Sequence, residues 1–209
     1  MSENFVLVSL ATAVLSIIVV FIVWKESKEE KEIKLAEEEQ KQENQRRLRE
    51  LRQKESKEWN KKIQAKFDGK VKYKTNKPVK ILVGDYTASM APYTNSILRS
   101  MGLETEVVPT ASDIIERIES ESHYDLIITN NIYANGERGY TVLEKIKFEE
   151  KNDIPIIILT VDQNARKEYI GQGFDEYIEK PLDEKKVINV FTKFIDGLEF
   201  KKIKSNKSA

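Results

Sequence analysis

The chain has 209 residues, with 35 Lys and Arg balanced by 35 Asp and Glu, a single histidine and no cysteine. A net charge of zero argues against a nucleic-acid-binding surface, which needs clustered excess positive charge. The lack of cysteine excludes disulfides and thiolate sites, and one histidine, His123, excludes a histidine-rich metal site.

The first segment after residues 1–4 (MSEN) is apolar and long enough to cross a membrane. Phe5–Trp24 holds about 20 uncharged residues, which as a helix span a hydrocarbon core of about 30 Å. A cleaved signal peptide is the main alternative, but it normally starts with basic residues and has a shorter apolar stretch. A buried core helix would lack an apolar neighbour. Lysines follow Trp24 and none precede Phe5, so we expect a single-pass anchor in the cell membrane with the rest of the chain in the cytoplasm.

Residues 25–68 are a charged segment with the composition of a helix, since they contain neither Pro nor Gly. Opposite charges four residues apart stabilise a helix by a few tenths of a kcal/mol each. The expected pairs are Glu30–Lys34, Glu43–Arg47, Arg46–Glu50, Glu50–Lys54 and Glu58–Lys62. An apolar coiled-coil seam is missing between Ala36 and Leu48. A lone helical stalk, which needs no partner, and a weak coiled coil therefore both fit.

After a short linker, residues 69–78, the pattern changes to alternating strands and helices over residues 79–197. Apolar runs predict five strands: Val79–Val83, Thr105–Val108, Leu126–Thr129, Ile156–Thr160 and Glu176–Glu179. Amphipathic stretches predict five helices: Ala91–Met101, Ser112–Glu121, Tyr140–Lys147, Ala165–Gly171 and Asp183–Ile195. This alternation is typical of an α/β domain with a doubly wound five-stranded parallel sheet. Residues 198–209 are expected to be a basic C-terminal tail.

Polar residues follow several of the predicted strands, at the edge where a parallel sheet of this kind places its site. The first strand ends in Gly84-Asp85, the third in Asn130-Asn131, the fourth in Thr160 and the fifth in Lys180-Pro181. We expect these residues to lie close together.

This set resembles the receiver domain of bacterial response regulators (the CheY-like family, with a flavodoxin-like fold). The resemblance covers Val79 to about Ile195 and rests on "KILVGDYTASMAPYTNSILRSMGLE", "ASDIIERIES", "YDLIITNN", "IPIIILTV" and "GFDEYIEKPLD". None of these segments is specific alone. A Thr in the fourth strand, an aromatic in the fifth and a Lys-Pro after it, in this order, form a stronger signal together.

The resemblance implies a phosphorylation site. A working receiver holds magnesium with two acids after the first strand and an aspartate at the end of the third, and that aspartate accepts the phosphoryl group. Carried over by position, Thr160 and Lys180 would bind phosphoryl oxygens and Tyr177 would be the switch aromatic. Asp85 matches the second acid.

The chain departs from this pattern where the chemistry takes place. Gly84 replaces the first acid, Asn130 occupies the acceptor position, and the loop after it is one residue longer, with Ala134 where a proline is usual. An amide is not the anionic nucleophile that an acyl phosphate requires. With Asp85 the one expected carboxylate that remains, we expect Lys180 to pair with it, phosphorylation to be disabled and magnesium binding to be weak or absent. Restoring Asp at positions 84 and 130 should then restore the magnesium site.

We therefore expect a degenerate pseudo-receiver: no enzyme and no cofactor, but a membrane-tethered protein-interaction module in signal transduction. The family's usual signalling face, which includes Tyr169, Tyr177 and Lys180, would bind a histidine kinase, another response regulator or a second copy of the chain. Two alternatives stay open: a receiver that is phosphorylated at a displaced residue or binds a small ligand in the depleted pocket, and a structural component of a membrane assembly. Four tyrosines fit either the mouth of the site or ordinary packing: Tyr86, Tyr93, Tyr133 and Tyr140.

Overall fold

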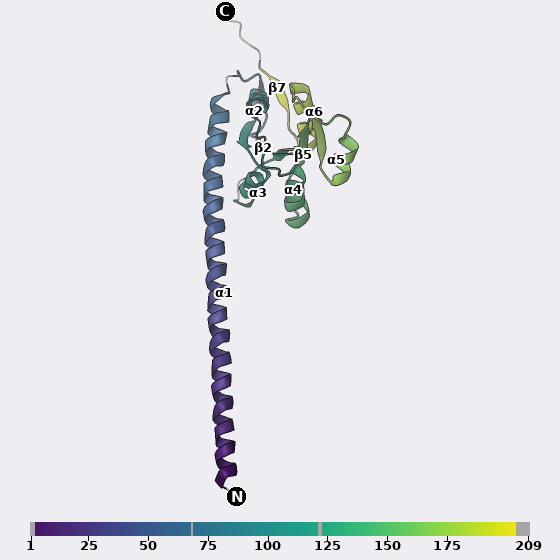
Figure 1. Ribbon diagram of the computed structural model, residues 1–209. Coiled ribbons are helices and arrows are strands. Elements are labelled where there is room, and N and C mark those ends of the chain that lie inside the picture. Colours follow the sequence, from purple (N-terminus) through teal and green to yellow (C-terminus); the bar gives the residue numbers. More distant parts are fainter. Residues whose placement is uncertain (1–2, 68, 121–122, 204–209) are drawn as a thin grey trace, which may run out of the picture. The chain divides into compact units, whose positions relative to one another are not determined.

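The computed structural model describes residues 3–67, 69–120 and 123–203, with side chains described from Phe21 onward except Ile22. The chain divides into two compact units, Met1–Leu51 and Arg52–Ala209. The helix α1 (Glu3–Ala65) begins in the first unit and ends in the second. The remaining elements all belong to the second unit (Figure 1).

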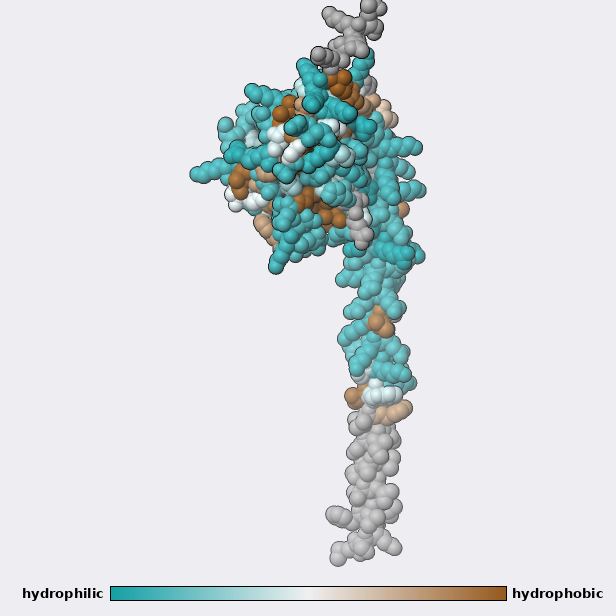
Figure 2. Space-filling view, turned by 180° about the vertical axis from the view of Figure 1, so that it is seen from behind, coloured by the Kyte–Doolittle hydropathy of each residue, from teal (hydrophilic) through white to brown (hydrophobic). Residues whose placement is uncertain are grey.

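The first unit is helical throughout its described residues. Three of the expected ion pairs form along it, Glu30–Lys34, Glu43–Arg47 and Arg46–Glu50, together with Lys25–Glu29 and Lys28–Glu32. The surface of this helix after Trp24 is mostly hydrophilic, with isolated apolar side chains (Figure 2). These apolar side chains, Ile33, Leu35, Leu48 and Leu51, are each more than half exposed. A solvated single helix fits this surface without a partner.

The expected membrane anchor falls mostly outside the described residues. The backbone of Phe5–Trp24 is part of α1, but the side chains of residues 5–20 and 22 are not described. In the described part of the chain, no helix has an apolar stretch long enough to span a bilayer. The anchor stays a prediction from sequence.

The second unit contains the predicted five-stranded parallel sheet, in the order β3-β2-β4-β5-β6. The strands are β2 (Lys80–Gly84), β3 (Glu104–Val108), β4 (Leu126–Asn130), β5 (Ile156–Thr160) and β6 (Glu176–Glu179). Each differs from its predicted range by at most one residue at either end. Consecutive strands that are joined by helices and paired in parallel confirm the doubly wound fold.

Helices cover both faces of this sheet. They are α2 (Met90–Ser100), α3 (Ala111–Glu119), α4 (Gly139–Leu143), which continues as the π-helical turn η1 (Glu144–Glu149), α5 (Arg166–Gln172) and α6 (Glu184–Phe194). The glycine that ends α5 is Gly173, with a left-handed φ of 110°, whereas Gly171 lies inside the helix. A residue without a Cβ adopts this conformation at little cost.

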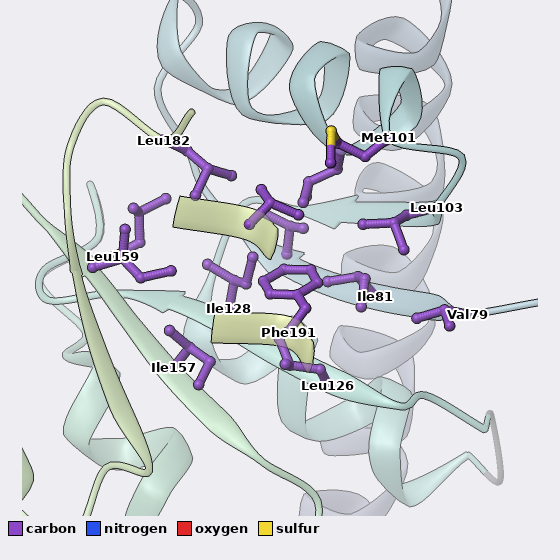
Figure 3. Close-up of a cluster of buried hydrophobic side chains, with 14 of the residues drawn as sticks. Val79, Ile81, Met101, Leu103, Leu126, Ile128, Ile157, Leu159, Leu182 and Phe191 are labelled. Atoms are coloured by element: carbon purple, nitrogen blue, oxygen red, sulfur yellow. The ribbon is translucent and has the colours of Figure 1, made fainter. Parts of the chain in front are cut away.

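Two apolar cores lie on opposite faces of the sheet because successive strand side chains point to opposite sides. Residues of β2 such as Ile81 and Val83 pack with α2 and α6 in one core, shown around Phe191 in Figure 3. Leu82 lies on the other face and packs with α3, α4 and α5. Burying each of these Leu, Ile and Phe side chains contributes about 1.5–3 kcal/mol to folding.

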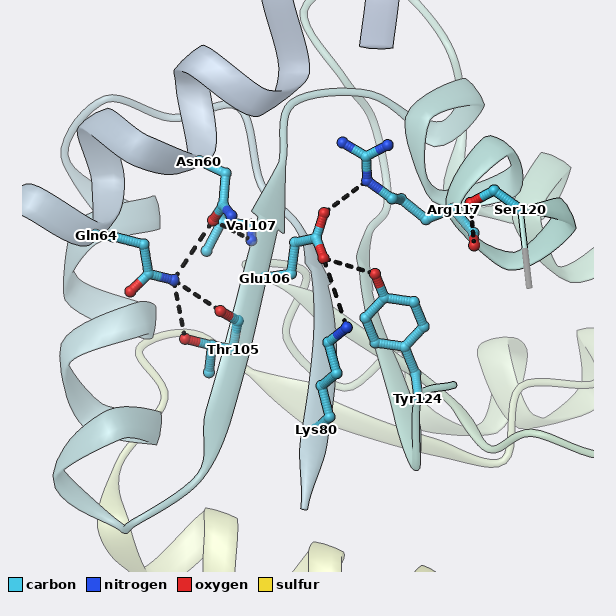
Figure 4. A network of polar contacts seen from close by, with 9 residues as sticks. All are labelled: Asn60, Gln64, Lys80, Thr105, Glu106, Val107, Arg117, Ser120 and Tyr124. Carbon is cyan, nitrogen blue, oxygen red and sulfur yellow. Dashed lines mark hydrogen bonds and ion pairs between the residues drawn. The ribbon is translucent and has the colours of Figure 1, made fainter. Parts of the chain in front are cut away.

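The compact unit that contains the sheet begins at Arg52, so the end of α1 belongs to it. Ile63 is 1% exposed and packs in the core with α2 and α6. Two amides from the same helix contact the outer edge of β3 (Figure 4). The Asn60 Oδ1 accepts from the Val107 N–H at 2.8 Å, and the Gln64 Nε2 donates to the Thr105 carbonyl at 2.7 Å. The last turns of the expected stalk therefore cover a sheet edge.

The second unit also contains a small two-stranded sheet. The strand β1 (Tyr73–Thr75) lies in the expected linker and pairs antiparallel with β7 (Phe200–Lys202) in the expected tail. Lys72 and Tyr73 both contact the Glu184 carboxylate at the start of α6, at 2.8 and 3.0 Å. The segments that precede and follow the α/β domain in sequence therefore pair with each other as a two-stranded sheet.

Candidate functional site

The candidate site lies at the carboxyl ends of the central strands, as the sequence predicts. Asp85 follows β2, Asn130 ends β4, Thr160 ends β5 and Lys180 follows β6. All four residues lie at one edge because the strands are parallel. Three of them line a cavity of about 360 Å³, whose other lining residues are Tyr86, Thr87, Met90, Asn131, Ile132, Leu159, Val161 and Asp162.

Asp85 is fully buried, and protein groups contact both of its carboxylate oxygens. Its Oδ1 accepts from the Thr87 N–H at 3.0 Å, the Thr87 hydroxyl at 2.6 Å and the Asn130 Nδ2 at 3.1 Å. Its Oδ2 contacts the Lys180 Nζ at 3.4 Å, which confirms the expected ion pair. A buried charge needs this many partners to offset its desolvation. Asp85 and Lys180 thus offset each other's charge inside the protein.

Asn130, at the acceptor position, is 4% exposed and directs its amide nitrogen toward Asp85. Its Oδ1 has no hydrogen-bond partner among the described residues. A buried acceptor without a partner is unfavourable by about 1–3 kcal/mol unless water or a ligand donates to it. The amide is thus a donor on the Asp85 side and a free acceptor on the other.

Thr160 is engaged by a neighbour in its own loop. Its hydroxyl donates to the Asp162 Oδ2 at 3.2 Å and accepts from the Asp162 N–H at 3.2 Å. The same carboxylate accepts from the Tyr169 hydroxyl at 2.7 Å and from the Asn131 amide at 3.1 Å. These hydrogen bonds, that of Tyr169 first, lower the pKa of Asp162 below its ordinary value. Asp162 therefore accepts hydrogen bonds from three side chains, and the sequence pattern did not single it out.

Tyr177, the expected switch aromatic, stacks on Tyr169 with ring centroids 5.9 Å apart and an angle of 16° between the planes. Its hydroxyl donates to the main-chain carbonyl of Asp162. Tyr177 is not among the residues that line the cavity. The two tyrosines and Asp162 therefore form one packed unit beside the pocket, which joins β6, α5 and the loop after β5.

Tyr133 is the site residue whose importance the sequence did not reveal. It is 2% exposed, and its hydroxyl lies 2.7 Å from the Thr129 hydroxyl and 3.4 Å from the Gly84 carbonyl. The other three tyrosines considered for the mouth of the site, Tyr86, Tyr93 and Tyr140, are each more than a third exposed. The one signal in the sequence is that Tyr133 lies in the loop that is longer by one residue.

The residues present do not fit the magnesium ion that receivers bind. Magnesium requires oxygen ligands in octahedral geometry, usually with one or two carboxylates. Here Gly84 supplies no ligand, Asn130 presents an N–H donor toward Asp85, and both oxygens of Asp85 are occupied by protein donors. Throughout the described residues, no group of three or more His, Cys, Asp or Glu side chains is placed to hold a metal.

Comparison with protein families matches residues 81–192 to the response regulator receiver domain. The chemotaxis protein CheY of Treponema pallidum (strain Nichols) is 31% identical over 115 residues, which cover 53% of this chain and 78% of that protein. The hybrid signal transduction histidine kinase D of Dictyostelium discoideum is 29% identical over 126 residues, or 56% of this chain. This chain spans 8% of the kinase's length.

A solved structure from Chloroflexus aurantiacus J-10-fl, assigned as a response regulator, shares the fold. It aligns with a TM-score of 0.51 and 21% identity, and the alignment covers 57% of this chain and 98% of that one. At this identity the likeness concerns the fold alone.

Proposed function

Since the chain belongs to the response regulator receiver domain family of two-component signalling, we propose that it is a receiver that works by binding and not by phosphorylation. The observation that carries this proposal is the Asp85 carboxylate, whose donors are Thr87, Asn130 and Lys180. A phosphorylatable site needs an anionic nucleophile and a cation to offset it. This pocket has an amide in place of the nucleophile and an internal lysine in place of the cation. We assign it no enzymatic activity and no metal cofactor.

The module would act at the cytoplasmic face of the cell membrane, held there by Phe5–Trp24. The apolar length of this segment and the lysines that follow it support this placement. The charged stretch of α1 would then serve as the spacer between bilayer and receiver. Its five surface ion pairs contribute little energy individually but suit a solvated helix.

The binding face would be formed by α5, β6 and α6, and its partner would be a histidine kinase, another response regulator or a second copy of the chain. Tyr169 and Tyr177 are packed into one unit on this face. Because both hydroxyls donate hydrogen bonds to Asp162, we expect this face to keep its shape without a phosphoryl group. A preordered surface avoids part of the entropic cost of binding.

Site-specific crosslinking in cells tests this face. A photoreactive amino acid is placed at Lys167 on α5 or at Asn189 on α6, both of which are exposed. The matched control places it at His123, whose side chain is 86% exposed in the loop before β4, at the other end of the strands. We expect crosslinks to a signalling protein or to a second copy from the first two positions and none from the control. Equal labelling at all three positions would contradict the proposal.

A second candidate function is binding of a small ligand in the depleted pocket, or phosphorylation at a displaced residue. The cavity of about 360 Å³ that Asn130 helps to line favours the ligand version, because a donor that reached the buried Asn130 Oδ1 would satisfy an acceptor without a partner among the described residues. Peptide mapping after incubation with a phosphodonor and Mg²⁺ separates the versions. A stable phosphoryl group on any residue would favour the displaced site.

A further inference from the structure

The position of the missing first acid is already filled. A Cβ atom at Gly84 would lie 2.1 Å from the Tyr133 hydroxyl oxygen, 3.1 Å from the Tyr133 Cζ and 2.4 Å from the Ile114 Cδ1. Contacts below 3.0 Å are essentially never found for real Cβ atoms, so something has to move. The Ile114 Cδ1 belongs to a buried apolar side chain that makes no hydrogen bonds, whereas the Tyr133 hydroxyl is held by several. The tyrosine is the obstacle.

Hydrogen bonds and packing hold the Tyr133 hydroxyl in this position. It contacts the Thr129 hydroxyl at 2.7 Å, the Gly84 carbonyl at 3.4 Å and the Asn130 N–H at 3.3 Å. The ring packs against Tyr86 with the centroids 6.3 Å apart. Displacing the ring would break these contacts and leave polar groups of β4 without partners inside the protein, which is unfavourable.

The loop that carries Tyr133 is fixed as well. The Tyr133 N–H donates to the Glu137 carbonyl at 2.9 Å, and the Gly136 N–H donates to the Tyr133 carbonyl at 3.0 Å. The Glu137 carboxylate accepts from the Ser112 N–H at 2.9 Å and from the Ser112 hydroxyl at 2.6 Å, at the start of α3. The longer loop is therefore bonded to the start of α3, while the hydroxyl of its tyrosine lies against Gly84 and Thr129.

We propose that Tyr133 acts as a plug: its hydroxyl takes the space and the hydrogen bonds at the position of the first acid, and it makes Gly84 obligatory. Position 84 then has no room for a carboxylate while Tyr133 is in place. The residues Gly84, Tyr133 and Thr129 pack as one group, so the missing first acid cannot be restored by a substitution at position 84 alone. This goes beyond the proposed binding role and holds whichever partner the module binds.

The plug predicts that, against the expectation from sequence, Asp at positions 84 and 130 alone does not restore the magnesium site. Adding Asp at position 84 inserts a side chain into occupied space. Burial raises the pKa of Tyr133 above its ordinary value, so its hydroxyl carries no negative charge that could replace the missing carboxylate. Restoring the site requires removal of the tyrosine along with both substitutions.

Magnesium titration of the full-length chain in detergent micelles tests this inference by calorimetry. The variants are N130D, G84D/N130D and G84D/N130D/Y133L. We expect G84D to add no affinity to N130D and to lower the melting temperature by about 5 °C or more, as overpacking does. The added Y133L change should recover the melting temperature and raise magnesium affinity by about tenfold over N130D. If G84D/N130D binds magnesium tenfold more tightly than N130D with Tyr133 in place, the plug does not exist.

A double-mutant cycle that measures stability without metal tests the plug even if the triple variant does not fold. Gly84→Ala is introduced with and without Tyr133→Phe, which removes the hydroxyl oxygen and keeps the ring. We expect the loss in melting temperature caused by G84A to be at least halved in the Y133F background. An equal loss in both backgrounds would overturn the proposal. Crosslinking from the binding face is unaffected by either result, so failure of the plug and failure of the proposed function are distinguishable.

Discussion

The buried carboxylate of Asp85 forms an ion pair with Lys180, and this pair sets the charge at the centre of the site. Asp85 is 1% and Lys180 10% exposed at the side chain. Breaking a buried pair is costly because it leaves one charge without compensation, while replacing both partners by neutral groups is tolerated far better. We therefore expect the loss of Lys180 alone to be unfavourable for the folded state.

Lys180→Met is expected to lower the free energy of unfolding by about 1–3 kcal/mol, because the Asp85 carboxylate stays buried with only neutral donors. The double variant D85N/K180M should recover most of this loss. Urea denaturation measures both, and Lys167→Met, at an exposed lysine on α5, is the matched control with almost no expected effect. A loss in the double variant as large as in K180M would contradict the neutral-pair account.

The residue-scale chemistry could be predicted only in part from sequence. Asn130 and Gly84 are visible because they stand at strand ends whose positions the apolar runs define. The role of Tyr133 was hidden because a tyrosine in a loop gives no signal about where its hydroxyl points. That direction depends on the contact of Glu137 with the start of α3, which joins distant parts of the sequence. Asp162 was missed for the same reason.

Among the elements, the end of α1 and the strand β3 show how a sheet edge is protected. An edge strand presents unpaired N–H and carbonyl groups that invite pairing with other chains. Here the Asn60 and Gln64 side chains satisfy Val107 and Thr105, as a neighbouring strand would. Gln64 also accepts from the Arg99 guanidinium at 2.5 Å, which links α1 to α2.

The double variant N60A/Q64A is expected to lower the free energy of unfolding by about 2–4 kcal/mol, from two or more lost hydrogen bonds to partly buried groups. Alanine favours helix, so lower helix propensity does not explain such a loss. The control is Lys61→Ala, at an exposed position of the same helix. Thermal unfolding followed by Trp59 fluorescence measures the change, and equal stability of the variant and the control would contradict the edge-covering role.

A second contact between elements predicts a pH dependence. Burial would raise the pKa of Glu176 on β6, but hydrogen bonds from Lys193, the Tyr177 N–H and Arg166 outweigh it and lower the pKa overall. A carboxyl with a lowered pKa in the folded state adds stability above its ordinary value of 4.5, and this is lost as pH falls through the lowered value. Glu176→Gln should therefore be less stable than wild type at pH 7, and the gap should close below about pH 4. A difference in the free energy of unfolding between wild type and Glu176→Gln that stays constant from pH 7 to pH 3, measured by urea denaturation, would count against this.

The five strands and five helices could be predicted closely because continuous apolar runs mark the strands and amphipathic stretches mark the helices. The small β1–β7 sheet could not be predicted. Its strands have three residues each, and they are stabilised by pairing across the whole domain instead of by a local pattern. The packing of the α1 end was missed because Trp59 and Ile63 lie in the charged segment that the sequence assigns to the stalk, whereas they pack in the core of the α/β unit.

For the whole molecule, the proposal combines a membrane anchor with a receiver that signals without phosphate. The anchor predicts that the full chain stays with membranes after alkaline carbonate washing. Val14→Asp with Ile18→Asp should release it, because each charge at the centre of a spanning helix is unfavourable by about 2.5–3.5 kcal/mol. The control pair Val14→Leu and Ile18→Leu should leave it in place. Release of the wild-type chain by carbonate would contradict a spanning helix.

The central claim is that this receiver carries no phosphoryl group. Intact-mass spectrometry tests it most directly, on the full-length chain incubated with Mg²⁺ and acetyl phosphate or with a histidine kinase and ATP. A phosphorylatable receiver of the family, treated in parallel, shows that the donors are active. The account predicts an unchanged mass for this chain under both donors. A stable phosphoryl adduct on the wild-type chain would contradict it.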